Sequence, residues 1–171
     1  MKTYVLTLSK TFPKWHPRAG EPTYFKEKFE QAQAITKAGK FPCVLPYPDF
    51  IDPKYHTLRG NYERWEKVFE QIDQGEACLV LKQWSGVPYR SKQETIAVLT
   101  KEDGIGIQRL FFNADSDGQH VWWNFNIDGR YDVIERLAAN DGLSLDDWKA
   151  WFKSCDLSKP LAIIHFTPFR Y

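Results

Sequence analysis

The sequence predicts an α+β fold in which short strands close into a small mixed β-barrel flanked by helices. Apolar runs typical of strands are separated by short helical patterns, and most strand pairs can be joined by hairpins. A length of 171 residues suits a single domain, residues 1–171. The 43% hydrophobic and 16% aromatic residues are enough to form one core.

The amino-terminal third contains one predicted strand and one predicted helix. Alternating apolar residues predict a strand over residues 4–8. A proline- and glycine-rich stretch, 11–22, predicts an extended loop. Thr23 is expected to cap a helix over 24–38, and Gly39 to end it. Four prolines between 41 and 53 favour an extended connection, because proline lacks an amide donor.

The middle and end of the chain contain both the helical spacing of apolar residues and the alternating pattern of strands. Apolar residues three and four apart predict a helix over 62–73, which ends at Gly75. Asp117-Gly118 predicts a hairpin turn, and Ser144 is expected to cap a late helix, with Asp147 completing a capping box. The remaining expected elements are strands over 55–58, 78–83, 93–99, 109–112, 120–125 and 161–167, and a helix over 131–139.

Composition restricts the classes of partner. The net charge is +1, so nucleic-acid contact must come from a local patch, and binding to duplex DNA is not expected. No run reaches membrane-spanning length and no signal peptide is recognised, so no membrane partner is expected. The three cysteines, Cys43, Cys78 and Cys155, lack metal-ligand spacing. They predict a reduced cytoplasmic interior with no metal and no cofactor.

The most informative motif is Lys54-Tyr-His-Thr-Leu-Arg59, followed by Leu79-Val-Leu-Lys-Gln-Trp84-Ser-Gly-Val-Pro-Tyr89. With the stretch 137–148, which precedes a final strand, these residues resemble the ASCH family of the PUA-like superfamily. The resemblance covers residues 24–168, with an enlarged loop at 41–53 and an added hairpin at 113–127. It implies a β-barrel that holds RNA or a modified base at its mouth.

Some small bacterial ASCH proteins are amidohydrolases that act on N4-acetylcytidine, and their active residues are a lysine, a threonine three positions later and a glutamate. Carried over, these roles fall on Lys54, Thr57 and Asp141. Lys54 and Thr57 match in type and spacing, whereas Asp141 is one methylene shorter than glutamate. Arg59 matches a basic residue of the same motif.

Amide hydrolysis needs a nucleophile, a base and a donor for the developing oxyanion. A desolvated Lys54 would have a lowered pKa and could deprotonate Thr57, with Arg59 or a backbone amide serving the oxyanion. Strict strand alternation places Lys54 and Thr57 on opposite faces, so they meet only if the chain bends near Pro53. The alternative is that Lys54 is a solvated strand end and Thr57 a simple β-former.

A second group of residues could bind a ligand without catalysis. The predicted binding residues are Tyr55, His56, Arg59, Trp84, Tyr89, Arg90 and Lys92. The aromatic rings could stack on bases and the cations could meet phosphates. The alternatives are a packed histidine, a rim salt bridge and a hairpin with an aromatic clasp. Two functions therefore stay open: hydrolysis of an acylated pyrimidine nucleoside, and non-catalytic binding of single-stranded RNA. The oligomeric state is open too.

Overall fold

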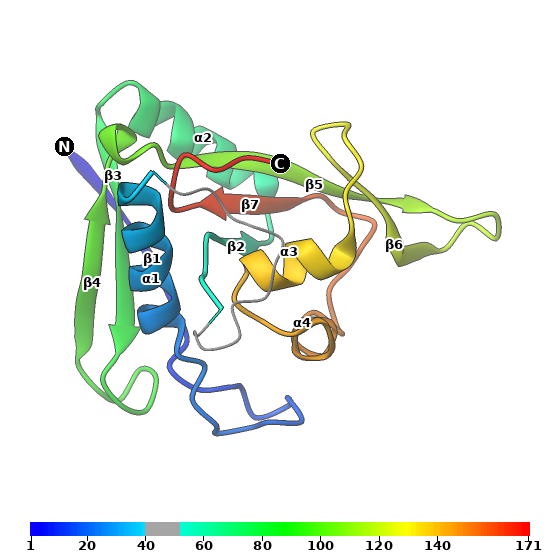
Figure 1. Ribbon diagram of the computed structural model, residues 1–171, viewed down its shortest axis with the longest axis horizontal. Helices are drawn as coiled ribbons and strands as arrows, with labels where there is room; N and C mark the ends of the chain where they lie inside the picture. Colours follow the sequence, from blue (N-terminus) through cyan, green and yellow to red (C-terminus); the bar gives the residue numbers. More distant parts are fainter. Residues whose placement is uncertain (40–51) are drawn as a thin grey trace.

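The computed structural model describes residues 1–39 and 52–171, and these form a mixed α+β structure (Figure 1). The predicted α+β class is confirmed. In chain order the elements are β1 (Lys2–Thr7), α1 (Phe25–Lys37), β2 (His56–Arg59), α2 (Tyr62–Asp73), β3 (Ala77–Trp84), β4 (Gln93–Leu99), a 3-10 turn (Lys101–Asp103), β5 (Gly106–Ala114), β6 (His120–Ile127), α3 (Ile134–Asn140), α4 (Leu145–Trp151) and β7 (Leu161–His165).

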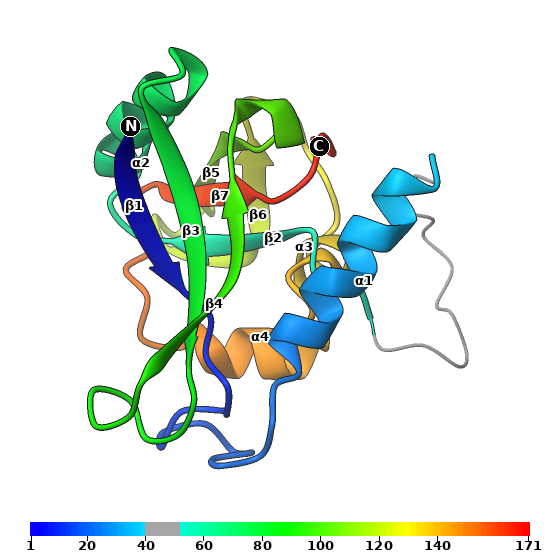
Figure 2. The ribbon, with the colours of Figure 1, turned by 90° about the vertical axis from the view of Figure 1, so that its left-hand side faces the viewer.

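The strands form two sheets. One has three strands in the order β1-β3-β4, and the other has four antiparallel strands in the order β2-β7-β5-β6. Figure 2 shows the three-stranded sheet crossing in front of the β2 and β7 strands. Over residues 1–39 and 52–171 the strands do not join into one hydrogen-bonded barrel, so the expected closure stays a prediction.

The parallel pairing of β1 with β3 was not predicted by the sequence. Lys2 pairs with Ala77, and the register continues to Thr7 and Lys82. Parallel strands need a long crossover, which here runs through α1, β2 and α2. Because of this crossover, β2 lies beside the end of β1, where Arg59 donates to the Thr7 carbonyl (2.9 Å) and where the candidate site is found.

Helix α2 agrees with the predicted bounds, and its apolar stripe is buried against the sheets. Trp65, Val68, Phe69 and Ile72 are all buried, as the three-and-four spacing indicates. The side chain of Asn61 accepts from the Arg64 amide and caps the helix. This helix connects the two sheets through the core, because it contacts β3, β5 and β7.

Two helix starts differ from the prediction. Helix α1 begins at Phe25, one residue late, with Tyr24 as N-cap in a left-handed conformation. The Thr23 hydroxyl accepts from the Phe25 amide (3.3 Å) and donates to the Ser9 carbonyl (2.6 Å). Helix α3 begins at Ile134, not at residue 131. Its N-cap Val133 has an extended backbone (φ −97°, ψ 140°), so the chain before Ile134 is not helical.

Other differences are shifts at element ends. The 113–127 insertion is the outer part of the β5–β6 hairpin, which extends away from the rest of the molecule (Figure 1). Its turn is at Gly118 as predicted, where φ is 78°. Ser144 caps α4 by accepting from the Asp147 amide (3.1 Å).

Residues 40–51, with Cys43 and most of the predicted extended connection, lie outside the described residues. No helix in the described part of the chain is long and apolar enough to cross a membrane.

Candidate active site

A cleft of about 180 Å³ lies where the end of β1, the start of α1, β2 and the segment around α4 meet. It brings together four of the predicted residues, Lys54, Thr57, Arg59 and Asp141. The full lining is Thr7, Leu8, Ser9, Phe25, Lys54, Thr57, Arg59, Asp141, Leu143, Trp151 and Phe152.

Lys54 is the most buried cation that lines the cleft, at 1% exposure. Its ammonium donates to the main-chain oxygen of Asp141 (2.6 Å) and to the Asp141 carboxylate. It also lies 4.2 Å from the centre of the Phe25 ring, which places it over the aromatic face. The three hydrogens of the amine are therefore oriented by protein groups, and the nitrogen is held in the wall of the cleft.

Burial controls the protonation of this pair. Removal from water lowers the pKa of Lys54 to about 8, although the Asp141 charge and hydrogen bond raise it and Arg59 lowers it further. The same burial raises the pKa of Asp141, against the opposing effect of Lys54. Both shifts favour the neutral forms, so Lys54 can release a proton at mildly alkaline pH.

Thr57 and Arg59 face the cleft from the same strand. The Arg59 Nη1 donates to the Thr57 hydroxyl (3.2 Å), and Nη2 donates to the carbonyl of Thr7 (2.9 Å). Arg59 makes no direct ion pair with any described residue, although the Asp141 carboxylate of the same cleft stabilises its charge electrostatically. Over residues 1–39 and 52–171, no hydrogen bond joins the Lys54 amine to the Thr57 hydroxyl.

The conflict with strand alternation is resolved by where β2 begins. Lys54 precedes the strand, and its amide donates to the Lys28 carbonyl (2.9 Å) of α1. The Tyr55 amide donates to the Asn140 carbonyl (2.8 Å). The chain therefore follows α1 and the end of α3 before it enters the sheet, and the pleat does not determine the direction of the Lys54 side chain.

Asp141 has two roles in the structure. It is the C-cap residue of α3, as expected for Asn-Asp-Gly, and it is also the carboxylate of the cleft. Gly142 follows at φ 76° and makes the turn that directs the chain past Lys54. The C-cap and the glycine turn that end α3 thus position the Asp141 carboxylate.

An aromatic wall that the sequence interpretation missed completes the cleft. Phe25, Trp151 and Phe152 line it together with the polar groups, and the Phe25 and Trp151 rings lie 5.6 Å apart. The pair at 151 and 152 follows Trp148 at helical spacing, which is a detectable signal for one face of α4. A polar floor with an aromatic wall suits a flat ligand that carries a polar group.

Two predicted binding residues are buried elsewhere. Tyr55 is 2% exposed and its ring lies against Phe169, and His56 is fully buried. Neither lines the cleft, because the Tyr55 ring packs against Phe169 and the His56 ring packs against His165 and Tyr171. We therefore assign them no contact with a ligand.

The β3–β4 loop carries the other predicted binding residues, and none of them lines the cleft. Tyr89 is 90% exposed at a positive φ of 64°, and its ring lies 5.3 Å from that of Trp84. Arg90 and Lys92 are exposed beside it. Lys10 donates to the Ser85 carbonyl (2.8 Å), so the loop is fixed to the chain just beyond Ser9 of the cleft.

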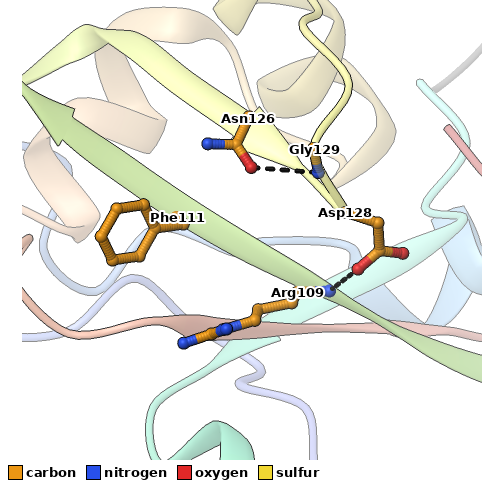
Figure 3. Close-up of a pocket in the computed structure, with 5 residues that line it drawn as sticks. All are labelled: Arg109, Phe111, Asn126, Asp128 and Gly129. Atoms are coloured by element: carbon orange, nitrogen blue, oxygen red, sulfur yellow. Dashed lines mark hydrogen bonds between the residues drawn. The ribbon is translucent and has the colours of Figure 1, made fainter.

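A second, more open hollow lies on the outer face of β5 and β6 (Figure 3). It is lined by Arg109, Phe111, Asn126, Asp128 and Gly129. Asp128 accepts from the Arg109 amide (2.9 Å), and Asn126 accepts from the Gly129 amide (3.1 Å). None of the residues predicted from sequence lies here, and the polar groups mostly satisfy the backbone of the turn.

Among the described residues, no group of three His, Cys, Asp or Glu side chains is placed to hold a metal ion. Comparison with known proteins finds no matching family model, no matching curated protein and no matching solved structure.

Proposed function

We propose that the chain is an ASCH-type, PUA-like domain whose cleft binds a modified nucleobase or nucleoside and hydrolyses an N-acylated cytidine. The observation that carries the proposal is that Lys54, Thr57 and Arg59 line one cleft with Asp141, which lies 87 positions from Lys54 in the chain. An amine with a lowered pKa, a hydroxyl and a guanidinium are the groups that amide hydrolysis requires.

The size of the cleft favours a compact substrate. Its volume of about 180 Å³ is below the roughly 300–1,000 Å³ of pockets that enclose drug-sized ligands. A planar base with a small acyl group suits this space better than a long acyl chain does. The aromatic wall of Phe25 and Trp151 offers apolar contact to the ring.

In the proposed mechanism the neutral Lys54 amine takes the Thr57 proton while the Thr57 oxygen bonds to the amide carbon. The pair comes into hydrogen-bond contact when substrate binds, as catalytic pairs commonly do. Arg59 donates to the carbonyl oxygen as charge develops on it. Cleavage of the C–N bond releases the amine of cytidine, which receives the proton from Lys54. Water then hydrolyses the acyl-threonine ester, which yields the carboxylic acid and restores the hydroxyl.

In this mechanism Asp141 keeps the Lys54 amine in place and raises its pKa against the larger lowering effect of burial. The test compares wild type with Asp141→Asn, using N4-acetylcytidine and chromatographic detection of cytidine. We expect wild type to release cytidine and Asp141→Asn to lose about 100-fold or more in rate. Asp146→Asn is the matched control, because Asp146 is an exposed residue of α4 and should keep the wild-type rate. Equal rates for Asp141→Asn and wild type would remove Asp141 from the mechanism.

A second candidate function is non-catalytic binding of single-stranded RNA. The observation that favours it is the exposed Tyr89 ring beside Trp84, with Arg90 and Lys92 next to it. Such a surface offers stacking to a base and charge to a phosphate without using the cleft. This candidate predicts binding without turnover, whereas hydrolysis predicts turnover that does not depend on the loop.

A further inference from the structure

A buried polar cluster lies behind the cleft and is not used by the proposed chemistry. The Tyr171 hydroxyl lies 2.7 Å from His56 Nε2 and accepts a hydrogen bond from the Asn140 amide nitrogen (3.1 Å). His56 is fully buried and Asn140 is 8% exposed. The cluster connects three segments of the chain that are far apart in sequence.

One of these hydrogen bonds has a fixed direction. Asn140 donates to the phenol oxygen, which leaves the phenol proton available to His56 Nε2. Burial, then the charges of His165 and Lys54, hold the pKa of His56 well below its usual value, so the ring is neutral and its tautomer decides whether Nε2 accepts from the phenol or donates to it. Burial also raises the pKa of Tyr171, so the phenol keeps its proton. The cluster is therefore an ordered chain from Asn140 through Tyr171 to His56.

Each end of this chain is next to a residue of the cleft. His56 precedes Thr57, and Asn140 precedes Asp141. We propose that Tyr171 is a positioning residue whose hydroxyl ties these two segments together and so fixes the separation of Thr57 and Asp141. The inference rests on the proposed function for its catalytic consequence, but the tie itself is a property of the fold.

A second link makes the role of Tyr171 specific. The Tyr55 amide donates to the Asn140 carbonyl (2.8 Å), which joins the same two segments through their backbones. Loss of the Tyr171 hydroxyl therefore leaves this backbone hydrogen bond in place but removes the side-chain link between His56 and Asn140. A shift that this loss allows affects catalysis more than substrate binding.

The test is Tyr171→Phe, which keeps the ring contacts with Phe169 and removes only the hydroxyl. We expect kcat on N4-acetylcytidine to fall about 100-fold, with KM within about twofold of wild type. Tyr4→Phe is the matched control, because the Tyr4 hydroxyl donates to Gln71 (2.9 Å) in a different part of the molecule. This control should keep the wild-type kcat.

A second measurement separates this inference from the proposed function. The pKa of Lys54, followed by NMR of isotope-labelled lysine, should fall below about 8 in Tyr171→Phe, because contact with Asp141 raises it. If wild type turns over no acylated cytidine, the proposed function fails while this measurement still decides the tie. Asn140→Leu should shift the pKa in the same direction if Tyr171→Phe does not fold. An unchanged Lys54 pKa in a folded variant would overturn the inference.

Discussion

Gly142 lies against the side chain of Lys54 so closely that a β-carbon on Gly142 would be 3.2 Å from the Lys54 Cβ. The same β-carbon would lie 3.2 Å from Lys28 Cδ. The Lys28 ammonium donates to the Gly142 carbonyl (2.6 Å). The two lysines therefore pack around one glycine, and this close packing holds Lys54 beside Asp141.

Replacement of this glycine should destabilise the fold by more than its backbone conformation accounts for. Gly142→Ala places a side chain at φ 76°, which costs about 1–2 kcal/mol, and also presses on Lys54. Gly118→Ala is the matched control, since its φ is 78° and nothing lies within 4 Å of the added carbon. Urea unfolding should show a larger loss for Gly142→Ala. Equal losses would mean that the packing around Lys54 is not tight.

The stability of the protein should depend on pH through Lys54. In the unfolded chain a lysine holds its proton up to about pH 10.5, whereas folded Lys54 releases it at about 8. Between these values the unfolded state binds more protons, so the free energy of unfolding rises with pH. The gain is at most about 3 kcal/mol. It should be absent from Lys54→Met, measured by urea unfolding between pH 7 and about 10.

Comparison with Lys54→Met removes the contribution of the other titrating groups to the pH dependence of the unfolding free energy. Burial also raises the pKa of Tyr62 to about 12, and unfolding at high pH is favoured by such groups because the unfolded phenol ionises first. The difference between wild type and Lys54→Met removes this contribution. A difference that stays constant from pH 7 to about 10 would show that Lys54 titrates near its ordinary pKa.

The rate of hydrolysis should also depend on the protonation of Lys54, which must be neutral to act as a general base. A base must be neutral, so kcat/KM for N4-acetylcytidine should rise with pH and level off above a pKa of about 8. The profile is measured with initial rates of cytidine release. A rate that falls as pH passes 8 would assign Lys54 the role of an acid.

The β3–β4 loop should bind single-stranded RNA if the second candidate function holds. Arg90→Gln and Lys92→Gln should each weaken binding and reduce the dependence of the binding constant on salt, because each removes one phosphate contact. Tyr89→Ala should weaken binding without changing that salt dependence, since stacking involves no charge. Lys159→Gln, at an exposed turn elsewhere, is the control. No binding at low salt would exclude this function.

Local patterns predicted much of the fold. The apolar spacing of Trp65, Val68 and Phe69 predicted α2, and the Asp117-Gly118 pair predicted the β5–β6 turn. The parallel pairing of β1 with β3 could not be predicted in this way, because it joins segments about 75 residues apart and leaves no local pattern. The start of α1 was placed one residue early because Tyr24 takes a left-handed conformation and becomes the N-cap, for which the sequence carries no signal.

For the candidate site too, local patterns predicted one part, and contacts between distant segments determine the rest. The spacing of Lys54, Thr57 and Arg59 placed all three in one segment, and the structure puts them with Asp141 in one cleft. Strand alternation alone argued against this arrangement, because it cannot show that Lys54 precedes β2. Tyr55 and His56 share that segment but are buried away from the cleft, against Phe169 and against His165 and Tyr171 respectively, and these distant contacts leave no local pattern in the sequence.

The most direct test of hydrolysis in this cleft is the rate of cytidine release by Thr57→Ala and Thr57→Ser. If Thr57 is the nucleophile, the alanine variant should lose about 1,000-fold or more, and the serine variant, which keeps a hydroxyl, should retain a substantial part of the wild-type rate. Thr95→Ala, at an exposed position of β4, should be unaffected. Turnover by Thr57→Ala at the wild-type rate would contradict the proposal that this hydroxyl attacks the substrate.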